Sequence, residues 1–170
     1  MIKLSNFVLI GMPGSGKSTF GRRLAQLRGL GFIDTDDLIE ESENSPIQKI
    51  VSRRGVRYLR TLEADILSSI QVENHVIATG GSAVYSNRAV DHLGRIGVRI
   101  YLKISLATLV KRVTNSENRG LAKMPQHSLP RLYRERLALY EQAADLVFAN
   151  DWPISAVRVD ALNAMLEASL

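Results

Sequence analysis

Gly11-Met12-Pro13-Gly14-Ser15-Gly16-Lys17-Ser18 is the stretch of this chain that decides its fold. It fits the pattern Gly-x-x-x-x-Gly-Lys-[Ser/Thr], in which a glycine-rich loop wraps around phosphate groups. The apolar residues Phe7-Val8-Leu9-Ile10 before it predict a buried strand, and Thr19 to Gln26 after it predict the start of a helix. A glycine-rich turn that matched by chance would have no reason to sit between a strand and a helix. The stretch therefore predicts a phosphate-binding loop.

The residues of this loop have separate chemical roles. Glycines let the backbone approach an anion closely, and backbone N–H groups and the positive end of the following helix then face it. Lys17 would reach the terminal phosphates of a nucleotide, and the Ser18 hydroxyl would ligate Mg²⁺. The predicted nucleotide site consists of Gly14, Ser15, Gly16, Lys17, Ser18 and Thr19.

Length and composition fit a single globular domain that spans residues 1–170. Apolar residues make up 45% of the chain and charged residues 23%, which is ordinary for a soluble protein. There is no cysteine, so disulfides and thiolate metal sites are excluded. No apolar run approaches the roughly 18 residues of a membrane-spanning helix, and the N-terminus shows no signal-peptide pattern. We expect a cytoplasmic protein without a membrane partner.

The net charge of +5 raises the question of a nucleic-acid partner, because 16 of the 22 basic residues are arginine. These arginines are scattered, with no dense basic run and little aromatic interleaving. The planar guanidinium group equally suits bidentate contact with a carboxylate or a phosphate. We therefore expect a small anionic substrate rather than a nucleic acid.

Strand-like and helix-like segments alternate along the chain. Short apolar runs rich in branched residues recur after the first strand, at Gly31–Ile33, His75–Ala78, Val98–Leu102 and Leu146–Phe148. Helical patterns fill the gaps, at Leu38–Glu41, Gly55–Ile70, from Ser128 onward and Ile154–Leu170, with Ser45 as a helix cap before Pro46 at a first helical position. This alternation predicts an α/β fold of three layers, in which helices cover both faces of a parallel sheet.

The segment Asn115–Pro125 breaks this alternation, since it is polar and punctuated by glycine and proline. It fits either a plain surface loop or a mobile lid over approximately 113–126. Phosphoryl transfer requires that water be excluded, and Arg119 within the segment would bring positive charge to the transferred group.

Asp34-Thr35-Asp36 directly follows the second predicted strand. Ligands of open parallel sheets bind at the carboxyl ends of the strands, so both acids are expected near the phosphate-binding loop, with their side chains on the same side. One carboxylate would hold Mg²⁺ and the other would act as a base on a substrate hydroxyl. Alternatively, Asp36 or Asp37 caps the helix that follows.

Thr79-Gly80-Gly81 ends the third predicted strand. Two adjacent glycines allow the backbone to approach a ligand closely, although a tight strand-to-helix turn would also use them.

Together these segments resemble the shikimate kinase family over essentially the whole chain. The matching features, in the family's order and near its spacing, are the phosphate-binding loop, Asp34-Thr35-Asp36, Leu59-Arg60-Thr61-Leu62-Glu63, Thr79-Gly80-Gly81, Arg119, and Arg136-Leu137-Ala138-Leu139-Tyr140 with Ala144-Asp145. The resemblance implies a fold like that of the nucleoside monophosphate kinases, with strand order 2-3-1-4-5. It also implies a monomer that uses ATP and Mg²⁺ to phosphorylate the 3-hydroxyl of shikimate, a step in aromatic amino-acid biosynthesis.

The resemblance also assigns roles to residues. Lys17, Asp36 and Arg119 are implied as catalytic, and Ser18 and Asp34 as magnesium ligands. The implied substrate site comprises Asp36, Arg60, Gly80, Gly81 and Arg136, in which the two arginines grip the shikimate carboxylate. At the nucleotide, Arg112 is implied to flank the adenine, Pro153 to lie in the adenine loop, and Arg119 to contact the phosphates. From the residues alone, Arg60 could instead pair with Glu63, and Arg136 with Glu135 or Glu141.

The chain departs from the family pattern at Val56, Leu59, Ser82 and Ala138, of which Leu59 and Ser82 are expected near the implied substrate pocket. In the lid, Gly120 replaces a proline and adds backbone freedom. These departures leave two alternatives open, a kinase of another small hydroxylated acid and a nucleotide-binding paralogue without catalysis.

Overall fold

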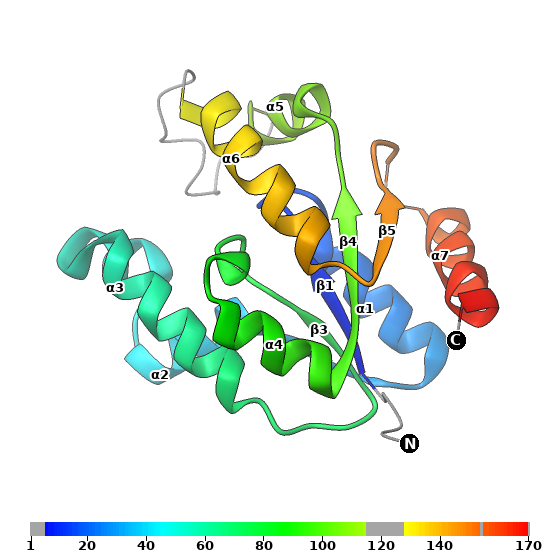
Figure 1. The fold of residues 1–170 in the computed structure, drawn as a ribbon, viewed down its shortest axis with the longest axis horizontal. Helices are drawn as coiled ribbons and strands as arrows, with labels where there is room; N and C mark the ends of the chain where they lie inside the picture. Colours follow the sequence, from blue (N-terminus) through cyan, green and yellow to red (C-terminus); the bar gives the residue numbers. More distant parts are fainter. Residues whose placement is uncertain (1–5, 115–127, 154, 170) are drawn as a thin grey trace.

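A computed structural model describes residues 6–114, 128–153 and 155–169. Its five strands are β1 (Asn6–Ile10), β2 (Gly31–Asp34), β3 (His75–Ala78), β4 (Gly97–Lys103) and β5 (Leu146–Ala149). They form one parallel sheet in the order β2-β3-β1-β4-β5, which confirms the predicted architecture (Figure 1). β1 lies at the centre, with Val8 in register with Ile77 of β3 and Arg99 of β4. The loop that follows β1 therefore emerges at the middle of the sheet.

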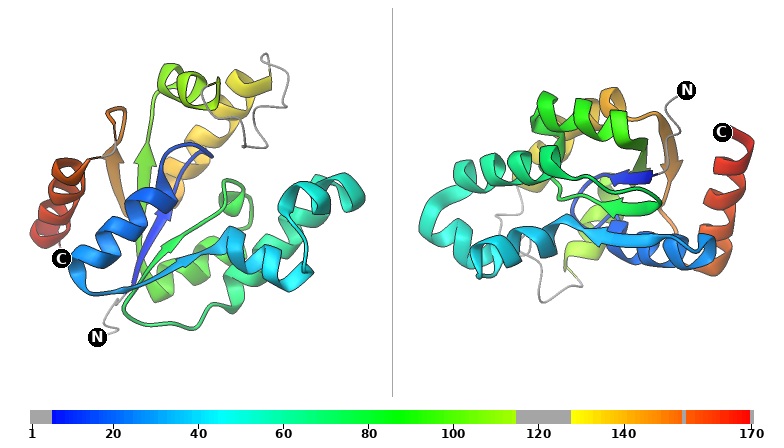
Figure 2. Two further views of the ribbon diagram at one scale, coloured as in Figure 1. Left: turned by 180° about the vertical axis from the view of Figure 1, so that it is seen from behind. Right: turned by 90° about the horizontal axis from the view of Figure 1, so that it is seen from below.

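The helices form the two outer layers (Figure 2). In chain order they are α1 (Lys17–Arg28), α2 (Thr35–Glu43), α3 (Ile47–Ser69), the 3₁₀ turn η1 (Ala83–Tyr85), α4 (Asn87–Ile96), α5 (Leu106–Thr114), α6 (Ser128–Ala143) and α7 (Ala156–Ser169). No helix in the described part of the chain is both long and apolar enough to cross a membrane.

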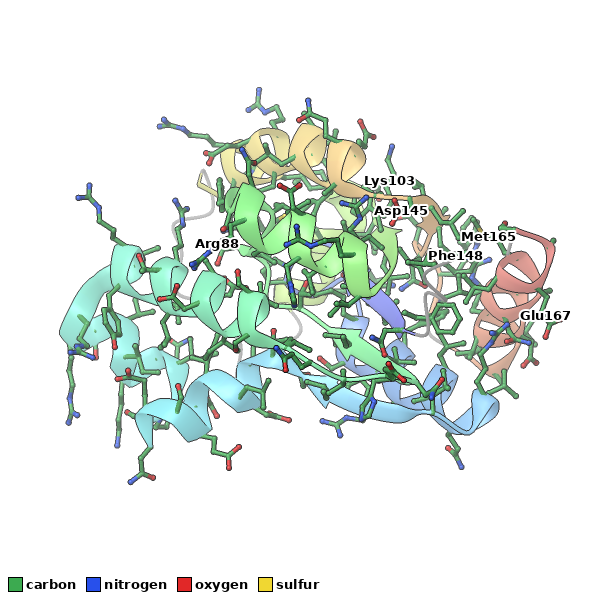
Figure 3. All side chains as sticks on the ribbon, turned by 60° about the horizontal axis from the view of Figure 1, so that its bottom comes forward. Arg88, Lys103, Asp145, Phe148, Met165 and Glu167 are labelled. Carbon is green, nitrogen blue, oxygen red and sulfur yellow. The ribbon has the colours of Figure 1, made fainter. Side chains whose placement is uncertain are left out.

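Alternation along the central strand divides the core into two clusters. Val8 and Ile10 face a cluster built with side chains from α3, α4, α5 and α6. Phe7 and Leu9 face the other, built with α1 and α7. On that side Phe148 of β5 meets Phe20 of α1 edge to face, with the ring centroids 5.7 Å apart, and Figure 3 shows Phe148 beside α7.

Two predicted helix starts are wrong. Asp34, not Asp36 or Asp37, caps α2, because its side chain accepts a hydrogen bond from the backbone N–H of Asp36 at 3.2 Å. The cap of α3 is Pro46, which makes no side-chain hydrogen bond, so Ser45 lies one residue outside it. Asp36 is consequently a residue of the first turn of α2. The prediction that alternation along a strand orients the Asp36 side chain is therefore wrong.

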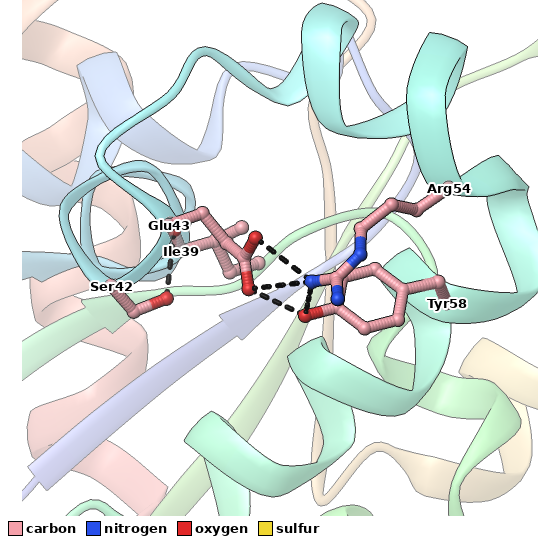
Figure 4. Close-up of polar contacts among 5 residues, drawn as sticks. All are labelled: Ile39, Ser42, Glu43, Arg54 and Tyr58. Carbon is pink, nitrogen blue, oxygen red and sulfur yellow. Dashed lines mark hydrogen bonds and ion pairs between the residues drawn. The ribbon is translucent and has the colours of Figure 1, made fainter.

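The long helix α3 is interrupted at Gly55, whose φ of 81° and ψ of 166° are not helical. On either side of this break lie Arg54 and Tyr58, and both contact Glu43 at the end of α2 (Figure 4). Arg54 donates to the Glu43 carboxylate at 3.2 Å, and its guanidinium lies 4.0 Å from the centroid of the Tyr58 ring. These contacts tie α2 to α3 across the interruption.

Candidate active site

The phosphate-binding loop joins β1 to α1 through left-handed glycines. Gly14 has a φ of 87°, and Gly16, the cap of α1, has a φ of 96°, where a side chain would be strained. Ser15 is fully buried between them, and its backbone N–H donates to the Met12 carbonyl at 2.9 Å. Ser18 and Thr19 are exposed on the first turn of α1. The loop thus leaves the start of a helix open to an anion.

Lys17 lies inside this loop with only 7% of its surface exposed. Its ammonium group donates to the carbonyls of Gly11 at 2.7 Å and Met12 at 3.0 Å. Burial lowers the pKa of Lys17 to about 8, although the nearby carboxylates of Asp36 and Asp34 oppose the change. The side chain therefore remains mostly protonated at neutral pH, as a group that binds phosphate must be.

The acids that follow β2 come close to this lysine. Thr35, which lies between them, is buried, and its hydroxyl accepts a hydrogen bond from the Gly80 backbone N–H at 3.0 Å. This bond joins the Asp34-Thr35-Asp36 segment to the glycine turn after β3. Solvent reaches the Asp36 side chain, yet the protein packed around it and the Asp34 carboxylate raise the pKa of Asp36 above its ordinary value. A raised pKa makes a carboxylate a stronger base.

The two glycines of this turn lie against close neighbours. A Cβ on Gly80 would lie 2.2 Å from Oε1 of Glu63 and 3.0 Å from Oδ1 of Asp36. One on Gly81 would lie 2.5 Å from the Pro13 ring and 3.1 Å from Nη1 of Arg136. The structure therefore brings the glycine turn, the phosphate-binding loop, Asp36 and Arg136 together.

Glu63 is a site residue that sequence reasoning did not assign. It is 3% exposed on α3 and accepts a short hydrogen bond from the Ser82 hydroxyl, while its Oε1 has no partner within the described residues. Burial raises its pKa to about 7, and the Ser82 hydrogen bond opposes this rise. The available signal was its position three residues after Arg60, one helical turn along α3.

The two arginines expected at the substrate come from different helices, Arg60 from α3 and Arg136 from α6. Arg136 is 7% exposed, and its Nε donates to the Tyr85 hydroxyl at 3.2 Å. The Arg60 guanidinium lies 4.0 Å from the centroid of the same tyrosine ring. The alternative prediction was that each arginine forms an ion pair with a neighbouring glutamate. Neither arginine forms such a pair among the described residues.

Arg112 connects the phosphate-binding loop to the loop after β5. It donates to the carbonyls of Gly14 and Ser15 at 3.2 Å each, and to the Asn150 carbonyl at 2.8 Å. Asn150, which sequence reasoning missed, is fully buried and donates to the Ser15 carbonyl at 2.8 Å. Pro153 is exposed three residues beyond Asn150. Arg119 and almost all of the predicted lid, approximately 113–126, lie outside the described residues.

Comparison with known proteins agrees with this geometry. The family model described as shikimate kinase matches residues 13–165. The chain belongs to the shikimate kinase family. A shikimate kinase of Clostridium botulinum strain Okra is 38% identical over 160 residues, which cover 92% of this chain and 94% of that protein. One from Sulfurihydrogenibium is 35% identical over 141 residues, 82% of this chain and 85% of that protein.

Solved structures of this family superpose along nearly the whole chain. Shikimate kinase from Acinetobacter baumannii in complex with shikimate has a TM-score of 0.84 and 29% identity, covering 99% of this chain and 97% of that one. Shikimate kinase from Bacteroides thetaiotaomicron has a TM-score of 0.87 and 25% identity, and the superposition covers 95% of this chain and 98% of that one. A deoxyadenosine kinase from M. mycoides, at 13% identity and a TM-score of 0.62 over 96% and 99% of the two chains, shares the fold alone. The chain is thus a small-molecule kinase of the shikimate kinase family.

Proposed function

We propose that this protein transfers the terminal phosphoryl group of ATP to the 3-hydroxyl of shikimate, in aromatic amino-acid biosynthesis. The observation that carries the proposal is that Asp36 and Arg136 lie against the Gly80-Gly81 turn, which packs on Pro13 of the phosphate-binding loop, and that both charges act on Lys17. A small acid with several hydroxyl groups needs one base, one cation for its carboxylate and a phosphate donor within reach. These groups meet that need.

Each residue then has a defined task. Lys17 binds the terminal phosphates and stabilises the charge that develops on them during transfer. Asp36 accepts a hydrogen bond from the attacking hydroxyl and takes its proton. Arg60 and Arg136 bind the carboxylate through charge-assisted hydrogen bonds. Arg119, on the proposed lid, adds positive charge at the transferred group.

The nucleotide end of the site suits ATP with Mg²⁺. Ser18 and Asp34 offer a hydroxyl and a carboxylate oxygen, and Mg²⁺ prefers oxygen ligands while keeping water and phosphate oxygens as the others. The ion would supply neutralising charge at the phosphates. Arg112 would support the adenine loop that carries Pro153. A single domain over 1–170, a monomeric state, a cytoplasmic location and the absence of a nucleic-acid partner stay predictions.

The direct test is a phosphorylation assay with ATP, Mg²⁺ and a panel of hydroxylated acids that includes shikimate and quinate. We expect shikimate to be consumed with release of one ADP per phosphorylated product, identified by ³¹P NMR. Turnover of another acid without turnover of shikimate would reject the proposed substrate. A protein that consumes no ATP with any acid would reject the kinase reaction itself.

The role of Arg136 is tested by Arg136→Ala, with the exposed Arg134→Ala on the same helix as the matched control. Loss of a hydrogen bond to a charged group should raise the KM for shikimate roughly ten- to hundredfold, with little change in the KM for ATP. The control should leave both constants unchanged. An equal rise in both KM values in Arg136→Ala would contradict the assignment.

A further inference from the structure

Tyr85 lies between the two arginines that this proposal places on the substrate carboxylate. It ends η1, the 3₁₀ turn that follows Gly80-Gly81-Ser82, and its side chain is half-buried. This turn packs against α3, which carries Arg60, and against α6, which carries Arg136. Both helices lie on the same face of the sheet (Figure 1).

The ring of Tyr85 holds Arg60. The Arg60 guanidinium carbon lies 4.0 Å from the ring centroid, well within the range of a cation–π contact. The Nε of Arg60 is buried and has no hydrogen-bond partner within the described residues. Arg60 and Tyr85 also line a hollow of about 340 Å³ between α3 and η1. This space would let the long arginine side chain adopt other rotamers, and stacking on the ring restricts it.

The hydroxyl of Tyr85 holds Arg136. It accepts a hydrogen bond from Nε of Arg136 at 3.2 Å and donates to Oε1 of Glu135 at 2.5 Å. The Glu135 contact fixes the direction of the hydroxyl. Because Nε is engaged there, the terminal nitrogens of Arg136 are directed to the glycine turn, where Nη1 would lie 3.1 Å from a Cβ on Gly81.

We infer that Tyr85 is a positioning residue that holds Arg60 and Arg136 in one arrangement and thereby sets the affinity for an acceptor that bears a carboxylate. The inference rests on the proposed function, since it takes the carboxylate as the group that the two arginines bind. Two guanidinium groups held in advance lose less rotamer entropy when the anion arrives. Tyr85 touches neither reacting group, so its effect belongs to binding and not to the transfer step.

Tyr85→Leu tests the inference, because leucine fills similar space without an aromatic face or a hydroxyl. We expect its KM for shikimate to rise roughly three- to thirtyfold, while kcat and the KM for ATP change little. The same measurement with shikimate methyl ester, which lacks the anionic carboxylate, should show almost no difference between the variant and the wild type. A merely structural role for Tyr85 would weaken both acceptors equally, and that result would overturn the inference.

Two further variants complete the experiment. Tyr85→Phe keeps the ring and removes only the hydroxyl, so its KM for shikimate should rise roughly two- to tenfold. If Tyr85→Leu fails to fold, this variant decides the question, and an unchanged KM would overturn the inference. Tyr58→Leu is the matched control, because it removes a tyrosine that also stacks on an arginine at 4.0 Å, Arg54, outside the proposed substrate site. A wild-type protein that does not phosphorylate shikimate would instead reject the proposed function, and the inference with it.

Discussion

The buried carboxyl of Glu63 should make the stability of this protein fall as the pH rises towards neutrality. Its pKa is about 7 in the folded protein against 4.5 for an ordinary glutamate, because burial disfavours its charged form. Between these two values the unfolded chain releases the Glu63 proton while the folded protein retains it. The unfolded state therefore binds fewer protons, and the free energy of unfolding decreases as the pH increases.

The size of the effect follows from the separation of the two pKa values. At about 1.4 kcal/mol for each pKa unit, the separation corresponds to a loss of about 3 kcal/mol between pH 4.5 and pH 8. The raised pKa of Asp36 acts in the same direction but begins near pH 3.8. The lowered pKa of Lys17 has the opposite sign, with stability rising between about pH 8 and 10.5. Asp36 and Lys17 also titrate in the variant Glu63→Gln, so comparison with that variant isolates the contribution of Glu63 between pH 5 and pH 8.

The assay is urea unfolding at pH 5, 6, 7 and 8 for the wild type and Glu63→Gln, which keeps the shape and a hydrogen-bond acceptor for Ser82 but does not titrate. We expect the stability of the wild type relative to the variant to decrease by about 2.5 kcal/mol between pH 5 and pH 8. Glu41→Gln, an exposed glutamate on α2, is the control and should run parallel to the wild type. If the curves for the wild type and Glu63→Gln also stay parallel, the carboxyl is not held protonated by burial and the reasoning fails.

Two other predictions concern the turn after β3 and the phosphate-binding loop. Tyr140→Phe removes the fully buried hydroxyl that donates to the Gly81 carbonyl at 2.6 Å, and should cost about 1–3 kcal/mol of stability. Thermal melting checks this. Tyr101→Phe is the control, because the hydroxyl of Tyr101, whose ring stacks on Tyr140, makes no hydrogen bond within the described residues. Equal losses of stability in the two variants would contradict the prediction. Lys17→Met should lower kcat roughly 10²- to 10³-fold while the protein stays folded, and a loss below about tenfold would reject its catalytic role.

Much of the fold was predictable because its signals are local. The phosphate-binding loop spans eight consecutive residues between a strand and a helix, and each of the five strands is a short apolar run. The exact helix starts were harder to predict. Asp34, Asp36 and Asp37 can all serve as caps by residue type, and the backbone path after β2 selected Asp34. The start of α3 at Ile47 lies one residue beyond the predicted first position, Pro46, and the helix then continues through the non-helical conformation of Gly55.

The sequence by itself determined the phosphate-binding loop, the family and the residue types available to the substrate, since all three depend on patterns within short segments or on their order. The tertiary structure alone decided how those residues act. Arg112 reaches Gly14 across 98 residues of sequence. Likewise, burial against the glycine turn raises the pKa of Glu63. Tyr85 contacts both Arg60 and Arg136, which belong to separate helices. Burial and long-range contacts arise only when distant segments pack together, so no local pattern encodes them.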